Sequence, residues 1–190
     1  ASGRPEFNPS FPDPDGEKAV VLRRLRARFE GLRENLMLVL HGCSHDQATS
    51  LCDTGFALVN FDDNGWFGQG LYTTTYSENA CGYATGELKN MLNPTNTNDE
   101  FVVLGCWVMP GNVYPISRAV DYRGQWSQYS SAPGQPAISL RNQFQAHYVC
   151  IGGDYQCIDN VCGGVEPVDD ELVVRESKQL LPAYRFFFRW

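Results

Sequence analysis

The sequence predicts an α+β protein of one domain, built around a mixed, mainly antiparallel sheet with few helices. Short apolar runs rich in β-branched and aromatic residues recur along the chain, whereas only one or two segments have the apolar spacing of a real helix. Strands that do not alternate regularly with helices favour α+β over α/β. With 190 residues and 43% hydrophobic content, the chain can bury one substantial core.

The first 35 residues are expected to form an extension and a helix that precede a main domain over residues 36–190. Residues 1–16 are rich in Pro, Gly and Asp, which is typical of an extended lead-in. Residues 17–34 predict an amphipathic helix with a buried stripe and a solvated face that carries arginines. The stripe consists of Val21, Leu22, Leu25, Phe29 and Leu32.

The next segments predict a strand, a short helix, a second strand and a second helix. LMLVLHG (36–42) is a short apolar run that ends in polar and glycine residues, as a buried strand does where it enters a loop. Residues 46–58 indicate a short helix that Gly55 closes. GWFGQGLYTT (65–74) predicts a strand interrupted by glycines, and residues 76–92 resume helical spacing.

The second half of the chain is expected to be mostly strands and loops. FVVLGCWVM (101–109) predicts a strand that Pro-Gly stops. Residues 121–146 contain much Gly, Ser, Gln and Pro, and we expect long surface loops there. HYVCI (147–151), ELVVR (171–175) and YRFFFRW (184–190) predict three further strands.

Charge and composition exclude several classes of protein. The net charge of −7 disfavours a broad nucleic-acid-binding role, because such a role needs a basic face. No apolar run approaches the ~20 residues that cross a bilayer, so we expect no membrane partner and a soluble chain. The seven cysteines leave both a secreted and an intracellular location open. No C-x-x-C pair occurs, and we expect no metal.

Three features that can carry chemistry follow one another in a fixed order. His41 and Gly42 end an apolar strand, Tyr72 follows a glycine-rich turn, and Glu171 opens a late strand. The blocks LHGC, FGQGLYTTTYSENACGYA and DELVVRESKQLLPAY resemble those of the poly(ADP-ribose) polymerases and the diphtheria-toxin-like ADP-ribosyltransferases, which are the H-Y-E transferases. The similarity runs in register from about residue 36 to residue 190.

The resemblance implies a fold, a substrate and a set of site residues. The fold would be the single-domain ADP-ribosyltransferase fold with a split sheet, and NAD+ would be the donor substrate. His41, Tyr72 and Glu171 would form the catalytic triad. The nicotinamide pocket would be completed by Gly42, Gly70, Ala80 and Tyr83.

The chemistry of NAD+ cleavage asks for these residue types. Tyr72 and Tyr83 would stack on the cationic nicotinamide ring, with cation–π attraction of roughly 0.5–2 kcal/mol each. The backbone of Gly42 could approach the carboxamide closely because it lacks a Cβ, and His41 would bond a ribose hydroxyl. Positive charge develops on the ribose as nicotinamide leaves, and the carboxylate of Glu171 would stabilise that charge.

The sequence departs from the polymerase pattern at two positions. Ala80 stands where many polymerases have a serine that contacts the carboxamide, and Thr73 stands where an aromatic residue is frequent. Both differences lean toward the toxin-like branch. In the loop before the glutamate, Tyr155, Cys157 and Cys162 are candidate contacts for the acceptor, although a plain surface loop fits this segment equally well.

We therefore expect a monomeric mono-ADP-ribosyltransferase that acts on a protein, which could be the enzyme itself. An NAD+ glycohydrolase needs the same pocket and remains an alternative. An inactive module that binds NAD+ or ADP-ribose, with a partner on the loops of 121–146, is a second alternative. Taken one by one, His41 could instead be a structural residue, Tyr72 and Tyr83 core residues, and Glu171 part of a solvated acidic edge.

Overall fold

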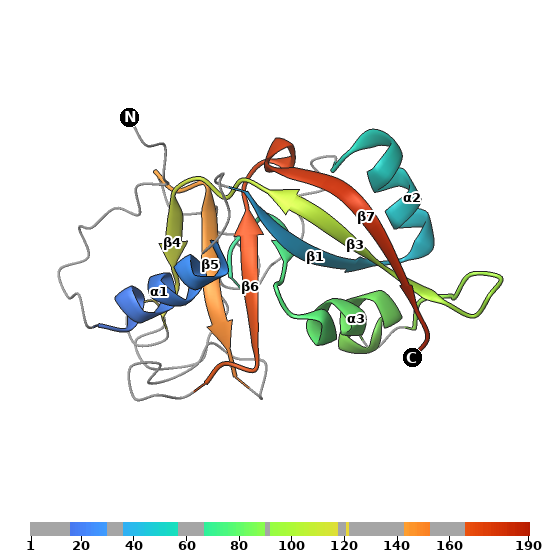
Figure 1. The fold of residues 1–190 in the computed structure, drawn as a ribbon, viewed down its shortest axis with the longest axis horizontal. Helices are drawn as coiled ribbons and strands as arrows, with labels where there is room; N and C mark the ends of the chain where they lie inside the picture. The colour runs from blue at the N-terminus through green and yellow to red at the C-terminus, as the bar shows by residue number, and fades with distance from the viewer. Residues whose placement is uncertain are drawn as a thin grey trace, which may run out of the picture.

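The computed structural model describes residues 16–29, 36–56, 67–89, 92–117, 121, 143–152 and 166–190. These residues form an α+β protein with three α-helices and two sheets, in which antiparallel pairing predominates (Figure 1). The predicted α+β class with a mainly antiparallel, mixed strand arrangement is confirmed.

The first sheet has three strands in the order β1-β3-β7. They are β1 (Met37–Cys43), β3 (Phe101–Val108) and β7 (Leu180–Phe188). The central strand β3 is antiparallel to both neighbours, and its pairing with β7 shifts register between Gly105 and Cys106.

The second sheet has four strands in the order β2-β6-β5-β4. They are β2 (Leu71–Thr73), β6 (Asp169–Val174), β5 (Ala146–Ile151) and β4 (Val113–Pro115). β6 is antiparallel to β2 and to β5, whereas β4 runs parallel to β5. The sequence did not predict β4. It also assigned residue 146 to a loop, and this residue instead begins β5.

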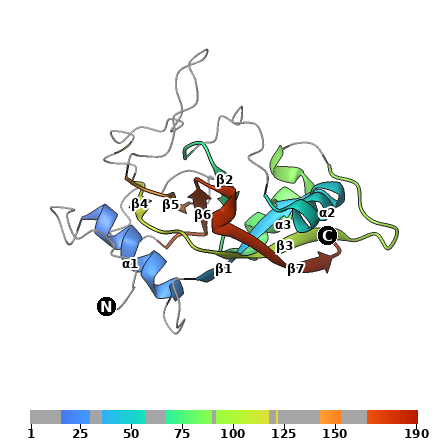
Figure 2. The same ribbon diagram turned by 90° about the horizontal axis from the view of Figure 1, so that it is seen from above.

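The helices cover different sheets. α1 (Glu17–Phe29) packs on β4 and β5 (Figures 1 and 2). α2 (His45–Thr54) and α3 (Ser77–Thr85) lie on opposite faces of the first sheet (Figure 1). Short 3₁₀ turns cover Glu87–Lys89 and Ser177–Gln179. Ser44 and Gln47 form a capping box at the start of α2, and Gly55 ends this helix with a positive φ of 77°.

One hydrophobic cluster extends through α1 and both sheets. Val21 and Leu25 of α1 are buried with Val39 of β1, Leu104 of β3 and Leu172 of β6. The helix in the segment 1–35 therefore shares its core with the strands that follow it. Leu32 of the predicted helical stripe lies outside the described residues.

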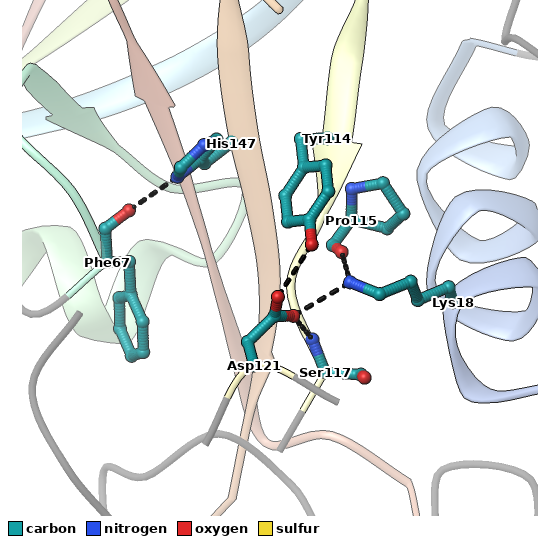
Figure 3. A network of polar contacts seen from close by, with 7 residues as sticks. All are labelled: Lys18, Phe67, Tyr114, Pro115, Ser117, Asp121 and His147. Carbon is teal, nitrogen blue, oxygen red and sulfur yellow. Dashed lines mark hydrogen bonds and ion pairs between the residues drawn. The ribbon is translucent and has the colours of Figure 1, made fainter. Parts of the chain in front are cut away.

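A buried ion pair also holds α1 to the second sheet. The Nζ of Lys18 lies 2.7 Å from a carboxylate oxygen of Asp121 and donates to the carbonyl of Pro115 at 2.7 Å (Figure 3). Asp121 also accepts hydrogen bonds from the Tyr114 hydroxyl at 2.6 Å and from the Ser117 N–H at 2.8 Å. The Lys18 ammonium lies 4.1 Å from the centre of the Tyr114 ring.

In the described part of the chain, no two cysteines form a disulfide, and no helix is long and apolar enough to span a membrane.

Candidate active site

The two sheets meet where β1 approaches the end of β2. Leu40 and Thr74 exchange two backbone hydrogen bonds, of 2.8 and 3.0 Å, which join the sheets at this point. On the other side of β2, Thr73 pairs with Leu172, the residue after Glu171. The predicted histidine, tyrosine and glutamate are therefore carried by three strands that converge on one junction.

Gly42 contacts α3 with one side of its backbone. A Cβ at this position would lie 1.9 Å from the carbonyl oxygen of Ala80 and 2.8 Å from the N atom of Ala84, so only glycine lets the helix pack this closely. The sequence predicts that the missing Cβ makes room for a ligand. In this structure the missing Cβ makes room for α3.

The backbone N–H and C=O of Gly42 do not point at β3 but at the open edge of β1. The N–H and C=O of Leu40 face Thr74, and in an antiparallel ladder these groups alternate sides from residue to residue. Those of Gly42 are therefore directed to the same side of β1 as those of Leu40, away from β3. At the junction this edge of β1 presents a donor and an acceptor, the pair that a carboxamide can match.

His41 is fixed by a backbone contact to β2. Its Nδ1 lies 2.9 Å from the carbonyl oxygen of Tyr72. Because a carbonyl only accepts, Nδ1 must carry the proton, and in the neutral ring Nε2 is then the acceptor nitrogen. The His41 ring also lies edge-on to Phe56, with ring centroids 5.2 Å apart.

Tyr72 is held by a polar clamp around the turn at residues 67 and 68. Its hydroxyl accepts from the N–H of Phe67 at 2.9 Å and donates to the carbonyl of Gly68 at 2.7 Å. The carbonyl of Phe67 in turn lies 2.8 Å from Nδ1 of the fully buried His147, as Figure 3 shows. The sequence did not single out His147, because a lone histidine in an apolar strand gives no motif.

Tyr83 and Glu171 meet across the junction. Tyr83 lies in α3, one turn beyond Ala80, and its hydroxyl donates to Oε1 of Glu171 at 3.3 Å. Glu171 is buried, with 6% of its surface exposed, whereas Tyr83 is half-buried. A glutamate in a solvated acidic edge would be exposed, so that reading does not describe Glu171.

Burial raises the pKa of Glu171 to about 8, and the negative charges of Asp169 and Asp170 add to this shift. Hydrogen bonds from Tyr83 and Asn79 favour the charged form and oppose it. Burial also raises the pKa of Asp169 to about 7. The site thus holds two neighbouring carboxyl groups on one face of β6, and both of them resist ionisation at neutral pH.

Asp169 and Asp170 belong to the buried part of β6 and not to a loop before it. Asp170 accepts hydrogen bonds from the Thr75 hydroxyl at 2.6 Å and from the Tyr148 hydroxyl at 2.9 Å. Asp169 accepts from the Thr74 hydroxyl at 3.0 Å. These bonds connect β6 to the segment between β2 and α3, which places the start of α3 relative to Glu171.

Ala80 and Gly70, two further residues predicted for the nicotinamide pocket, are packed against other parts of the protein. Ala80 is fully buried and packs with Ala84 and Val103, so its contacts in this structure are with protein, and its contact with NAD+ stays a prediction. At Gly70 a Cβ would lie 2.5 Å from the carbonyl oxygen of Val174, which explains the glycine by packing on β6.

Tyr155, Cys157 and Cys162, the candidate acceptor contacts, lie outside the described residues. Within the described ranges, no group of His, Cys, Asp and Glu side chains is arranged to hold a metal ion.

The fold and this junction define an α+β protein with a buried glutamate, two tyrosines and a histidine gathered between two sheets. Comparison with protein-family models and with curated protein sequences returns no match for this chain.

Proposed function

We propose that this protein is an NAD+-dependent mono-ADP-ribosyltransferase, which cleaves the bond between nicotinamide and ribose and transfers ADP-ribose to a protein. The observation that carries the proposal is the contact between the Tyr83 hydroxyl and the buried carboxyl of Glu171. The edge of β1 at Gly42 lies against the same helix. The resemblance to the H-Y-E transferases and the division into two sheets agree with an ADP-ribosyltransferase fold.

The residues at the junction suit the parts of NAD+ in turn. The backbone N–H and C=O of Gly42 would pair with the carboxamide of nicotinamide, and the rings of Tyr72 and Tyr83 would stack on its two faces. Nε2 of His41 would accept a hydrogen bond from a ribose hydroxyl, because Nδ1 is committed to the carbonyl of Tyr72.

Glu171 would act on the charge that develops during bond cleavage. When the C1′–N bond breaks, its electron pair goes to nicotinamide, which leaves neutral, and C1′ becomes positive. A carboxylate fixed on a strand stabilises this charge without reorganising. A nucleophile from the acceptor then forms the new bond to C1′ and passes its proton to the Glu171 carboxylate. The cationic nicotinamide ring would itself favour ionisation of Glu171 when NAD+ binds.

The Glu171→Gln variant tests this proposal directly. We expect wild type to release nicotinamide from NAD+, and the variant to lose at least ~10²-fold in rate, the scale for removing a positioned group that stabilises the transition state. The matched control is Glu87→Gln, an exposed glutamate on the turn after α3, which should keep the wild-type rate.

Labelled ADP-ribose distinguishes the possible acceptors in the same experiment. Label on a protein band, either this chain or a component of a lysate, identifies transfer. Nicotinamide release that leaves no labelled protein would instead indicate hydrolysis of NAD+. Tight NAD+ binding by wild type and by Glu171→Gln, with no turnover by either, would contradict an enzymatic role and favour a binding module.

A further inference from the structure

β7 is an edge strand that carries large apolar side chains. It pairs with β3 on one side, and its other edge meets no strand among the described residues. Tyr184, Phe186 and Phe187 are 47%, 45% and 51% exposed. A long apolar edge strand with free backbone groups is a template for pairing with another strand, and natural proteins usually protect such edges.

The backbone groups that face outward can be assigned from the ladder. The N–H and C=O of Leu40 face β2, so by alternation those of Val103 and Phe101, on the next strand, face β7. Val103 pairs with Phe186, and Phe101 pairs with Phe188. The N–H and C=O groups of Phe186 therefore point inward, and those of the residues on either side of it, 185 and 187, point outward.

The side chains of β7 form an aromatic row on one face. Tyr184 and Phe186 are stacked with ring centroids 6.0 Å apart, and Phe188 lies 5.7 Å from Phe101. The row passes over Gly105 of β3, and a Cβ at Gly105 would lie 2.7 Å from the Phe186 ring. Arg185 and Phe187 are on the opposite face, where the Nε of Arg185 donates to Sγ of Cys52 in α2.

We propose that β7 pairs antiparallel with β7 of a second copy of this chain, about a two-fold axis at Phe186. In this register Phe186 lies opposite Phe186, and Tyr184 lies opposite Phe188. Arg185 lies opposite Phe187 and exchanges backbone hydrogen bonds with it. The aromatic rows of the two copies then form one continuous row of rings across the joined sheets, and each Arg185 has a Phe ring beside it.

The sequence of β7 disfavours the two-fold registers about residues 184, 185 and 187. An axis at residue 185 would place Arg185 opposite Arg185, and an axis at residue 187 would place it opposite Arg189; like charges directly opposite are destabilising. An axis at residue 184 would run across the register shift and place Pro182 opposite Phe186. The register about Phe186 uses only the regular part of the strand. The pairing departs from the monomer expected from the sequence.

Sedimentation of the full chain at a series of micromolar concentrations measures the pairing. We expect wild type to form a dimer as concentration rises. Phe187→Arg would place two Arg–Arg pairs across the axis and weaken dimerisation by about tenfold or more. Phe187→Glu removes the same ring but places Glu opposite Arg185, so the dimer should persist. The double variant Arg185→Glu/Phe187→Arg should restore it.

Leu92→Ser is the control for non-specific hydrophobic association, since Leu92 is 76% exposed and is not part of β7. It should dimerise like wild type. Wild type that stays monomeric at every concentration would overturn the proposal. The proposal is equally overturned if Phe187→Arg and Phe187→Glu weaken association to the same extent, because the association would then depend on apolar surface and not on this register. Circular dichroism of each variant verifies that it is folded.

Discussion

Glu171 lies in an environment unlike that of an ordinary glutamate. A carboxyl that is buried beside two aspartates is held in its neutral form, and neutral carboxyl groups are poor partners for developing positive charge. The protein therefore keeps a group that it can ionise only at a cost in folding free energy. Such a cost is expected where a residue is retained for chemistry and not for stability.

The pH dependence of stability should reveal this carboxyl. Its pKa is raised from 4.5 to about 8, so the folded state binds one more proton than the unfolded state between these values. The stability that this proton confers is complete below pH 4.5 and is lost as pH rises to about 8, with a slope of up to about 1.4 kcal/mol per pH unit. In Glu171→Gln the part of this slope that Glu171 contributes should disappear, while the part from Asp169, whose pKa is raised to about 7, should remain. The variant should therefore be more stable than wild type at pH 9.

Urea unfolding of wild type and Glu171→Gln at half-unit steps of pH measures the effect. Glu87→Gln, on the surface, should follow the wild-type curve. If wild type and Glu171→Gln lost stability in parallel as pH rises, the carboxyl of Glu171 would be ionised at neutral pH.

At the level of elements, the contact between α3 and β1 determines where Tyr83 lies. Gly42 and the backbone of α3 touch at Ala80 and Ala84, and Tyr83 leaves the same helix to reach Glu171. The position of the tyrosine is therefore set by packing on the strand that carries His41. A displacement of α3 would move Tyr83 away from Glu171.

Gly42→Ala should push α3 away from β1. The new methyl would lie 1.9 Å from the Ala80 carbonyl oxygen, a backbone atom that cannot move alone, so we expect a loss of about 1–3 kcal/mol in unfolding free energy. Gly82→Ala is the matched control on the same helix, because the atoms nearest to its methyl belong to the flexible side chain of Leu88, at 3.0 Å, and not to backbone. Chemical denaturation compares the two, and equal stability of Gly42→Ala and wild type would contradict the packing.

The sequence predicted the elements that have strong local patterns. The strand at 101–109 and the helix closed by Gly55 were both identified, because β-branched runs and a terminal glycine act locally. β4 was missed, since three residues give no periodicity. It forms because Val113 pairs with Ala146, more than 30 positions away along the chain.

The site was predictable in its order of residues but not in its contacts. His41, Tyr72, Tyr83 and Glu171 were predicted from the resemblance. In the structure His41 contacts Tyr72 and Tyr83 contacts Glu171, and their role toward NAD+ stays a prediction. The burial of Asp170 could not be predicted, because it depends on the Tyr148 and Thr75 hydroxyls, which only the folded sheet brings to it. The packing role of Gly42 likewise depends on α3.

At the level of the whole molecule, α1 is part of the structure that supports the site. Lys18 and Asp121 form a buried pair, with side chains 11% and 0% exposed, and Asp121 also holds Tyr114. The Tyr114 ring lies 5.3 Å from the ring of His147, which bonds the turn that clamps Tyr72. A continuous series of contacts thus connects the helix before the strands to the tyrosine of the candidate site.

Breaking this pair from one side should cost more than removing both partners. Lys18→Met removes the Lys18 ammonium from the buried Asp121 carboxylate, and we expect a loss of about 3 kcal/mol or more in unfolding free energy. The double variant Lys18→Met/Asp121→Asn should lose less unfolding free energy than the two single variants lose together, by about 1 kcal/mol or more. Urea unfolding of the four proteins completes the cycle. Arg24→Met, at the exposed pair with Glu166, should have a far smaller effect, and additive losses would contradict coupling.

The order of strands in the first sheet has a consequence for synthesis. β3 lies between β1, more than 50 residues earlier, and β7, more than 70 residues later. While the chain is being translated, one edge of β3 therefore stays unpaired until β7, more than 70 residues later, has left the ribosome. At ~5–20 residues per second this interval lasts several seconds. The nascent chain exposes an apolar strand during that time, so chaperones that bind such strands have a defined window in which to act.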